Sequence, residues 1–404
     1  MSGSGAFGFE LGKLRMDIIP FLAKQRQALS LTQGIPKDYF IYALSFRLQY
    51  REAITAGTTN GTVLASAPEG LIEQVEISGN HKVFGDYVRL RLQGSHIYQR
   101  GNIWGGFQHE RSANLNAGAG VQDLNRDNAP TLTGAVANLD FSVNYMLHLV
   151  PPRTRPEEAL IYLLDPPLWN SLNVFVDWGD QTSYVQGGDR TLALAAYGSG
   201  SGSPALTVWR HIAKLKADRF KLNPVPIKDT YISIKAETTF TDSLVSPFNV
   251  GNFLRSLIVI TGVRASAGSI AKVGDAWLSL NGGAGQVPIS NGAQIIAAPF
   301  YTRVKIRKDD IAIRDMDWVP WQEWLGDSLD LSHFQLPNGW SIWDFAEGEV
   351  ADNTIATSFD TRQIALQNLK LTLEGDVTGA VDQRIHLLHN ELAGIPVYGS
   401  AASA

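Results

Sequence analysis

The sequence contains no cysteine, and this absence excludes several kinds of protein at once. Disulfide bonds, thiolate metal sites and thiol nucleophiles all require cysteine side chains, and none occurs among the 404 residues. The fold must therefore be held together by packing and hydrogen bonds alone.

The chain also lacks an excess of positive charge and a long apolar run. Lys and Arg total 34 against 39 Asp and Glu, which gives a formal net charge of −5. This balance disfavours direct nucleic-acid binding through phosphate contacts. We find no apolar run long enough to span a bilayer and no secretory signal, so neither an integral membrane protein nor a secreted one is expected.

Common catalytic motifs are missing as well. The sequence has no His-Glu-x-x-His zinc helix, no Gly-x-Ser-x-Gly nucleophile elbow and no Gly-x-x-x-x-Gly-Lys phosphate loop. The closest pair of histidines, His386 and His389, has helical spacing but lies in a predicted strand, so we interpret both as surface residues. The sequence predicts no catalytic residue, no cofactor and no enzyme activity.

One acidic region in the second half is a candidate calcium site. Several carboxylates crowd a short segment, although their spacing fits no EF-hand. Neighbouring basic residues, among them Arg303 and Arg314, can neutralise the carboxylates through surface ion pairs. The candidate calcium ligands are Asp309, Asp310, Asp315 and Asp317.

Three tryptophans close to this region also have two interpretations. Trp318, Trp321 and Trp324 are spaced every three residues. Exposed rings of this kind stack on sugars, but the same spacing describes one buried face of a helix. We prefer core packing within a helix or connector at residues 318–331.

Strand patterns fill most of the chain. From Tyr39 to Tyr50, large apolar residues alternate with smaller or polar ones, which predicts a strand with one buried face. Long polar loops, expected near residues 101–131 and 262–293 and facing outward, indicate β-sandwiches rather than a parallel α/β sheet. Further strands are predicted at residues 71–77, 87–92, 139–149, 172–178, 206–215, 231–240, 254–261, 341–345, 364–373 and 384–388.

Turn-forming residues divide these strands into two similar halves. A short helix is predicted at residues 156–164, between prolines that end one strand and precede the next. Pro224 and Pro226 mark a linker, after which the alternating pattern begins again. We predict an N-terminal arm at 1–38, sandwiches at 39–224 and 225–392, and a C-terminal tail at 393–404.

The N-terminal arm combines apolar and basic residues, and Pro20 interrupts it. The pattern predicts two short amphipathic helical pieces. Such an arm could lie on an anionic membrane, bind a neighbouring subunit, or pack against its own sandwich. The predicted contact residues are Phe7, Phe9, Leu11, Lys13, Leu14, Arg15, Ile18, Ile19, Phe21, Leu22, Lys24 and Arg26.

Specific segments of both halves follow one order of elements. In the first half, these are Leu147-His148-Leu149-Val150-Pro151, a short helix, Leu172-Asn173-Val174-Phe175-Val176-Asp177, a glycine-rich loop, Thr207-Val208-Trp209 and residues 212–215. In the second half, they are residues 330–334, Pro337-Asn338-Gly339-Trp340, and strands at 364–373 and 384–388.

This order of elements resembles the double jelly-roll major capsid proteins of tectiviruses, relatives by fold of the adenovirus hexon. The likeness covers residues 40–390, while the arm has a different sequence. It implies an all-β fold of two tandem eight-stranded jelly rolls with short connecting helices. It also implies a bacteriophage structural protein that forms pseudo-hexagonal homotrimers in an icosahedral shell over an internal membrane.

The same resemblance implies the partners and the location of the protein. Neighbouring capsomers, minor proteins and a different vertex protein would contact the trimer, and nucleic acid would not be bound directly. The protein would lie in the virion capsid after assembly in the host cytoplasm.

A second functional class remains open. A β-sandwich could bind or hydrolyse carbohydrate through exposed tryptophans and two carboxylates such as Asp177 and Glu347. A glycan ligand would then raise the melting temperature, whereas the coat-protein interpretation predicts no such effect.

Overall fold

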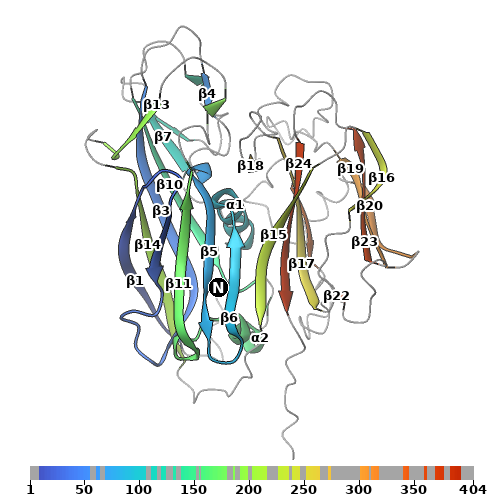
Figure 1. The fold of residues 1–404 in the computed structure, drawn as a ribbon, viewed down its shortest axis with the longest axis horizontal. Coiled ribbons are helices and arrows are strands. Elements are labelled where there is room, and N and C mark those ends of the chain that lie inside the picture. Colours follow the sequence, from blue (N-terminus) through green and yellow to red (C-terminus); the bar gives the residue numbers. More distant parts are fainter. Residues whose placement is uncertain are drawn as a thin grey trace, which may run out of the picture.

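The computed structural model is built mainly of β-strands with a few short helices (Figure 1). It describes residues 9–54, 61–63, 69–105, 111–115, 120–123, 131–132, 138–151, 154, 156–179, 185–186, 192–198, 203–215, 226–235, 239–245, 252–263, 272–273, 301–308, 311–317, 340–344, 359–361, 369–376 and 383–392.

The first half forms a sandwich of two antiparallel sheets. One sheet contains, in spatial order, β1 (Phe9–Pro20), β14 (Ala205–Leu215), β3 (Tyr39–Ile54) and β10 (Asn138–His148), with β7 (Arg111–Leu115) and β8 (Gly120–Asp123) beyond. The facing sheet contains β2 (Arg26–Ser30), β11 (Trp169–Trp178), β5 (Ile72–His81) and β6 (Gly85–Leu92). In chain order the main strands are 1-8-3-6 in one sheet and 2-7-4-5 in the other, which is jelly-roll topology.

The second half repeats this order. One sheet contains β15 (Ile227–Lys235), β24 (Gln383–Leu392), β17 (Phe253–Val263) and β21 (Trp340–Asp344). The other contains β16 (Thr239–Val245), β23 (Leu369–Asp376), β19 (Tyr301–Lys308) and β20 (Ile311–Asp317). The order is again 1-8-3-6 and 2-7-4-5, so the described strands confirm two tandem eight-stranded jelly rolls.

Several shorter strands lie outside the main strand order of the two jelly rolls. At one end of the first roll, three of them form a small separate sheet (Figure 1). The short strands are β4 (Gly61–Val63), β9 (Thr131–Leu132), β12 (Val185–Gln186), β13 (Leu192–Ala195), β18 (Lys272–Val273) and β22 (Phe359–Asp360).

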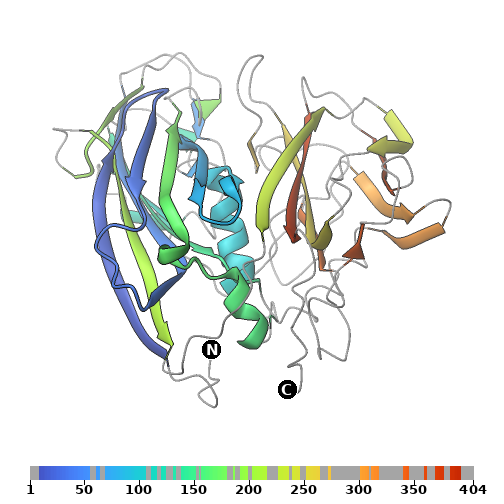
Figure 2. The same ribbon diagram turned by 60° about the horizontal axis from the view of Figure 1, so that its bottom comes forward.

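The two jelly rolls share one continuous sheet. Strand β15 lies parallel to β6, with Asp229 opposite Leu90, so the sheet of the first roll continues into that of the second. Both views show β6 and β15 side by side in the middle of the molecule (Figures 1 and 2). The rolls are therefore joined through backbone as well as through side chains.

Alternating side chains of the first roll build its core. On β3, Leu44, Phe46, Leu48 and Tyr50 are all buried, and the intervening Arg47 is exposed. The Phe46 ring stacks on Tyr145 of β10 with centroids 5.5 Å apart. Aromatic pairs of this kind add to the stabilisation from apolar burial.

A buried helix, α1 (Gly94–Gly105), packs against β10 beside the second roll. Its Ile97 and Tyr98 are buried. At Gly101 a Cβ atom would collide with the backbone oxygen of Met146, so only glycine allows this close approach. The other helical segments are η1 (Glu69–Leu71), α2 (Pro156–Tyr162) and η2 (Pro166–Leu168). Within the described residues, no helix has the length and apolar character needed to cross a membrane.

Most predicted strands and the helix at 156–164 are confirmed. Three predictions are wrong: the single strand at 231–240, the start of the loop at 101–131 and the helical N-terminal arm. Residues 231–240 are not one strand, because β15 ends at Lys235 and β16 begins in another sheet at Thr239. Gly101 and Asn102, at the start of the predicted outward loop, lie in the buried helix α1. The linker at 224 lies outside the described residues.

The third error concerns the N-terminal arm, which is not helical. Residues 9–20 form β1, and β2 lies in the facing sheet, so both belong to the first sandwich. A bulge between Arg15 and Ile18 shifts the alternation and brings Met16 and Ile19 into the interior. This shift gave the sequence its helix-like spacing.

Truncating a core side chain should show how much the core of the first sandwich contributes to the free energy of unfolding. We expect Leu48→Ala to lower the free energy of unfolding by about 2–5 kcal/mol, because it leaves a cavity between the sheets. The control Val83→Ala, at an exposed position, should change it by less than about 0.5 kcal/mol. Urea denaturation followed by tryptophan fluorescence measures both, and equal effects would contradict the assigned core.

Candidate functional site

A cluster of buried polar side chains lies where the two jelly rolls meet. We call it the seam. The first roll contributes Tyr87, Arg89, Gln93, His96 and Arg100, and the second contributes Ile227, Asp229, Tyr231, His386 and Asn390.

Asp229 of β15 is the centre of the seam. Its carboxylate is fully buried and accepts hydrogen bonds from Arg89 Nη1 at 2.6 Å and Arg100 Nη1 at 3.0 Å. Asn390 Nδ2 of β24 donates a third bond at 2.5 Å. Burial alone would raise the pKa of Asp229, but Arg100, Arg89 and Asn390 outweigh it and hold the pKa below its usual value. The carboxylate therefore stays charged.

The position of Arg89 comes from an irregularity in β6. The pairing with β5 shifts between Ile77 and Ser78, which leaves Arg89 as the extra residue of a bulge. Bulges redirect side chains out of the regular alternation. The bulge thus turns a charged residue toward the second roll. The Nη2 of Arg89 also donates to the Leu149 backbone oxygen of the first roll at 3.3 Å.

Two histidines form the second part of the seam. Burial, with His386 and Arg100 nearby, holds the pKa of His96 well below its ordinary value of 6.5, so the ring is neutral. Its Nδ1 accepts a hydrogen bond from the Gln93 backbone N–H at 3.3 Å. The ring hydrogen therefore sits on Nε2, which donates to Nδ1 of His386 at 3.0 Å.

Tyrosines complete the contact between the rolls. The Tyr87 hydroxyl donates to the Ile227 backbone oxygen, and Gln93 Nε2 donates to the Tyr231 hydroxyl at 3.4 Å. The rings of His96 and Tyr231 meet edge to face with centroids 4.8 Å apart. All these contacts join one roll to the other, so the seam fixes their relative orientation.

The interpretation of His386 and His389 as surface residues is wrong. Both are buried on β24, which lies between β15 and β17. Residues three apart on a strand point to opposite faces. His386 reaches the seam, and His389 therefore points to the other face of the sheet. His389 Nδ1 lies 3.3 Å from the Glu391 carboxylate.

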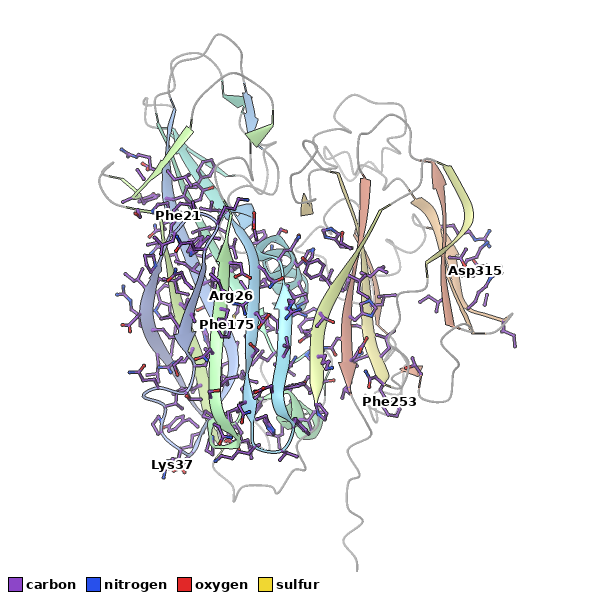
Figure 3. All side chains as sticks on the ribbon, in the orientation of Figure 1. Phe21, Arg26, Lys37, Phe175, Phe253 and Asp315 are labelled. Atoms are coloured by element: carbon purple, nitrogen blue, oxygen red, sulfur yellow. The ribbon has the colours of Figure 1, made fainter. Side chains whose placement is uncertain are left out.

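The candidate calcium ligands are not brought together in the described residues. Arg303 donates two hydrogen bonds to the Asp315 carboxylate, at 2.7 and 2.9 Å, on the outer side of the second roll (Figure 3). Asp317 ends β20, while Asp309 and Asp310 lie outside the described residues. No group of three or more metal-binding side chains occurs in the described part.

Only Asp177 of the candidate carbohydrate site lies within the described residues. Asp177 of β11 accepts hydrogen bonds from Gln74 at 3.1 Å and from Arg26 at 3.4 Å. Burial, with Glu76 nearby, raises its pKa although Arg26 opposes the shift. Glu347 and the three tryptophans of 318–324 lie outside the described residues.

Two basic residues of the N-terminal segment form ion pairs within the first roll. Lys24 pairs with Glu73 at 2.9 Å, and Arg26 pairs with Glu76 at 2.8 Å. The Arg26 guanidinium also lies over the Phe175 ring, 4.3 Å from its centroid. Figure 3 labels both residues. These contacts hold β2 at the edge of its sheet.

Some apolar residues of this segment are buried and others are exposed. Phe21 packs edge to face on Trp178 with centroids 5.3 Å apart. Leu14 is half-buried and Ile19 is buried, whereas Leu11, Ile18 and Leu22 are exposed. Phe7 lies outside the described residues.

Two jelly rolls in tandem define the double jelly-roll fold, and solved structures share it. The major capsid protein of Sulfolobus turreted icosahedral virus matches with a TM-score of 0.57 and 11% identity, over 98% of this chain and 100% of that chain. The capsid structure of virus PBCV-1 gives 0.52 and 11%, over 97% and 95%. The Faustovirus major capsid protein gives 0.52 and 9%, over 97% and 90%. The fold expected from the resemblance is confirmed.

Sequence comparison gives no corresponding match. No protein-family model and no curated protein sequence matches the chain.

Removing the central carboxylate should destabilise the protein strongly. We expect Asp229→Asn to lower the free energy of unfolding by about 3–5 kcal/mol, because two buried guanidinium groups lose their counter-charge. The control Glu73→Gln, which removes the exposed pair with Lys24, should cost about 0–1 kcal/mol. Urea denaturation at pH 7 compares them, and similar small losses would contradict the assigned role.

Acidification should weaken the seam through His96. Its pKa is lowered from 6.5 on folding, so the unfolded chain takes up the proton first and stability falls as the pH drops below 6.5. We expect the melting temperature to fall between pH 7 and pH 5. The fall should be smaller in His96→Gln, measured by differential scanning fluorimetry, and an unchanged slope would contradict this.

Proposed function

We propose that the chain is a viral major capsid protein, whose function is to assemble with copies of itself into a virion shell. The observation that carries this proposal is the tandem pair of jelly rolls with one strand order. The three solved capsid proteins share this fold over nearly the whole chain.

The assembly that we propose is a homotrimer with a pseudo-hexagonal outline. Three copies of a chain with two similar rolls present six similar faces around a threefold axis. Such a unit suits the sixfold positions of an icosahedral shell. Following the family that the sequence resembles, the shell encloses an internal membrane, contacts minor proteins and has another protein at its vertices. Assembly takes place in the host cytoplasm.

The seam supports this role because a shell unit needs a fixed shape. Buried ion pairs with one missing partner are strongly unfavourable. The charges of Asp229, Arg89 and Arg100 are therefore satisfied only when the two rolls dock in one orientation. We infer that the seam makes each chain a rigid building block.

For the N-terminal segment, we propose contact with a neighbouring subunit. The sequence allowed a membrane contact, a subunit contact or packing against the chain's own sandwich. An amphipathic helix would favour the membrane, but the segment is a β-strand at a sheet edge with Leu11 68% exposed. Edge strands present unpaired backbone groups that bind other chains.

The native mass tests the proposed function. Size exclusion with light scattering should give a particle of three chains of 44.1 kDa each, stable on dilution. Negative-stain images of the same fraction should show a pseudo-hexagonal outline. A stable monomer would overturn the proposal, and a glycan array would then test the carbohydrate alternative.

A further inference from the structure

The junction between the two rolls inside one chain follows a simple rule. In the order of main strands, β6 is the fifth strand of the first roll and β15 is the first strand of the second. These two lie parallel, with Asp229 opposite Leu90. The fifth strand of one roll therefore joins the first strand of the next.

Among the described strands, the same two positions form free sheet edges in the chain's two rolls. The first strand of the first roll is β1, and the fifth strand of the second roll is β20. Within the described residues, β1 pairs only with β14 and β20 only with β19. Figure 1 shows β1 at the left end and β20 near the right end of the molecule.

Exposed apolar side chains gather on these two strands. Among the described residues, six large hydrophobic side chains are exposed, and three of them lie on β1 or β20. Leu11 of β1 is 68% exposed and Ile311 of β20 is 71% exposed. Single exposed hydrophobics are common on surfaces, but here they coincide with the two open edges that the internal junction predicts.

We propose that copies of this chain join head to tail, with β20 of one copy lying parallel to β1 of the next. The proposal rests on the capsid function above and names the surfaces of the trimer contact. A contact between two different surfaces closes into a ring when its rotation allows. Three copies then form a ring of six rolls with a fifth-to-first strand junction at every step.

The parallel direction also fixes which side chains meet. Ile311 begins β20, and Leu11 lies near the beginning of β1, so a parallel pair brings these two apolar residues together. Arg15 of β1 and Asp315 of β20 lie further along the two strands, and both are exposed. An irregularity in β20 between Ala312 and Arg314 shifts its alternation by one residue, and Asp315 is already paired with Arg303. Leu11 and Ile311 are therefore the side chains that define this contact.

Single cysteines test this contact cleanly, because the chain has none of its own. We prepare full-length Leu11→Cys, Ile311→Cys and the double variant, treat each with a short bismaleimide, and separate the products on a denaturing gel. A head-to-tail contact joins position 11 only to position 311. The double variant should therefore give linked dimers and trimers. A mixture of the two single variants assembled together should give linked dimers, while each single variant alone should give none.

Val83→Cys combined with Ile311→Cys is the matched control, since Val83 is 62% exposed but lies on the turn between β5 and β6. The Leu11 and Ile311 pair should give at least about tenfold more linked product, because a held contact raises the effective concentration of the thiols. Product at the control level would overturn the proposed contact.

Light scattering of the untreated variants separates this result from a failure of the capsid proposal. A trimer mass without cross-links between positions 11 and 311 removes the contact and leaves the capsid function standing. A monomer mass removes both. Strong linkage of Leu11→Cys to itself would indicate a two-fold contact and would also overturn the head-to-tail arrangement.

Discussion

The placement of the two jelly rolls depends on one buried carboxylate. Asp229 is surrounded by Arg89, Arg100 and Asn390 from three other elements. A charge in a low-dielectric interior is tolerated only with its partners in place. The bulge at Arg89, the close approach of α1 at Gly101 and the buried position of β24 all serve this arrangement. The shared sheet adds backbone pairing, but the charges select the orientation.

Most of the fold could be predicted because the sandwich cores leave a period of two in the sequence. In β3 and β10, large apolar residues alternate with polar ones, and this alternation indicates which side chains are buried. It can be recognised without knowing which strand pairs with which. The N-terminal strand was misread because its bulge shifts that period by one residue. Helix α1 was missed because it is buried on several sides and contains glycines, so it has neither an apolar stripe nor strong helix propensity.

The seam could not be predicted at all. Asp229 and its two arginine partners lie 140 and 129 positions apart, and nothing in a single sequence links charges at such distances. The misreading of His386 has the same cause, since a polar residue on a strand looks exposed unless the neighbouring roll is known. The local pattern of β6 gives no signal either, because Val88, Leu90 and Leu92 alternate with Arg89 and Arg91, which predicts that Arg89 faces solvent.

Duplication of the roll has a consequence for assembly in solution. Between β14 and β15 the chain passes directly from one roll to the next, so this junction forms within a single molecule. The linker sets an effective local concentration, which for short linkers is on the order of millimolar. Separate rolls would instead have to meet by collision at their far lower cellular concentration. In the proposed ring of six rolls, half of the junctions would thus form during folding, independent of how much protein has been made.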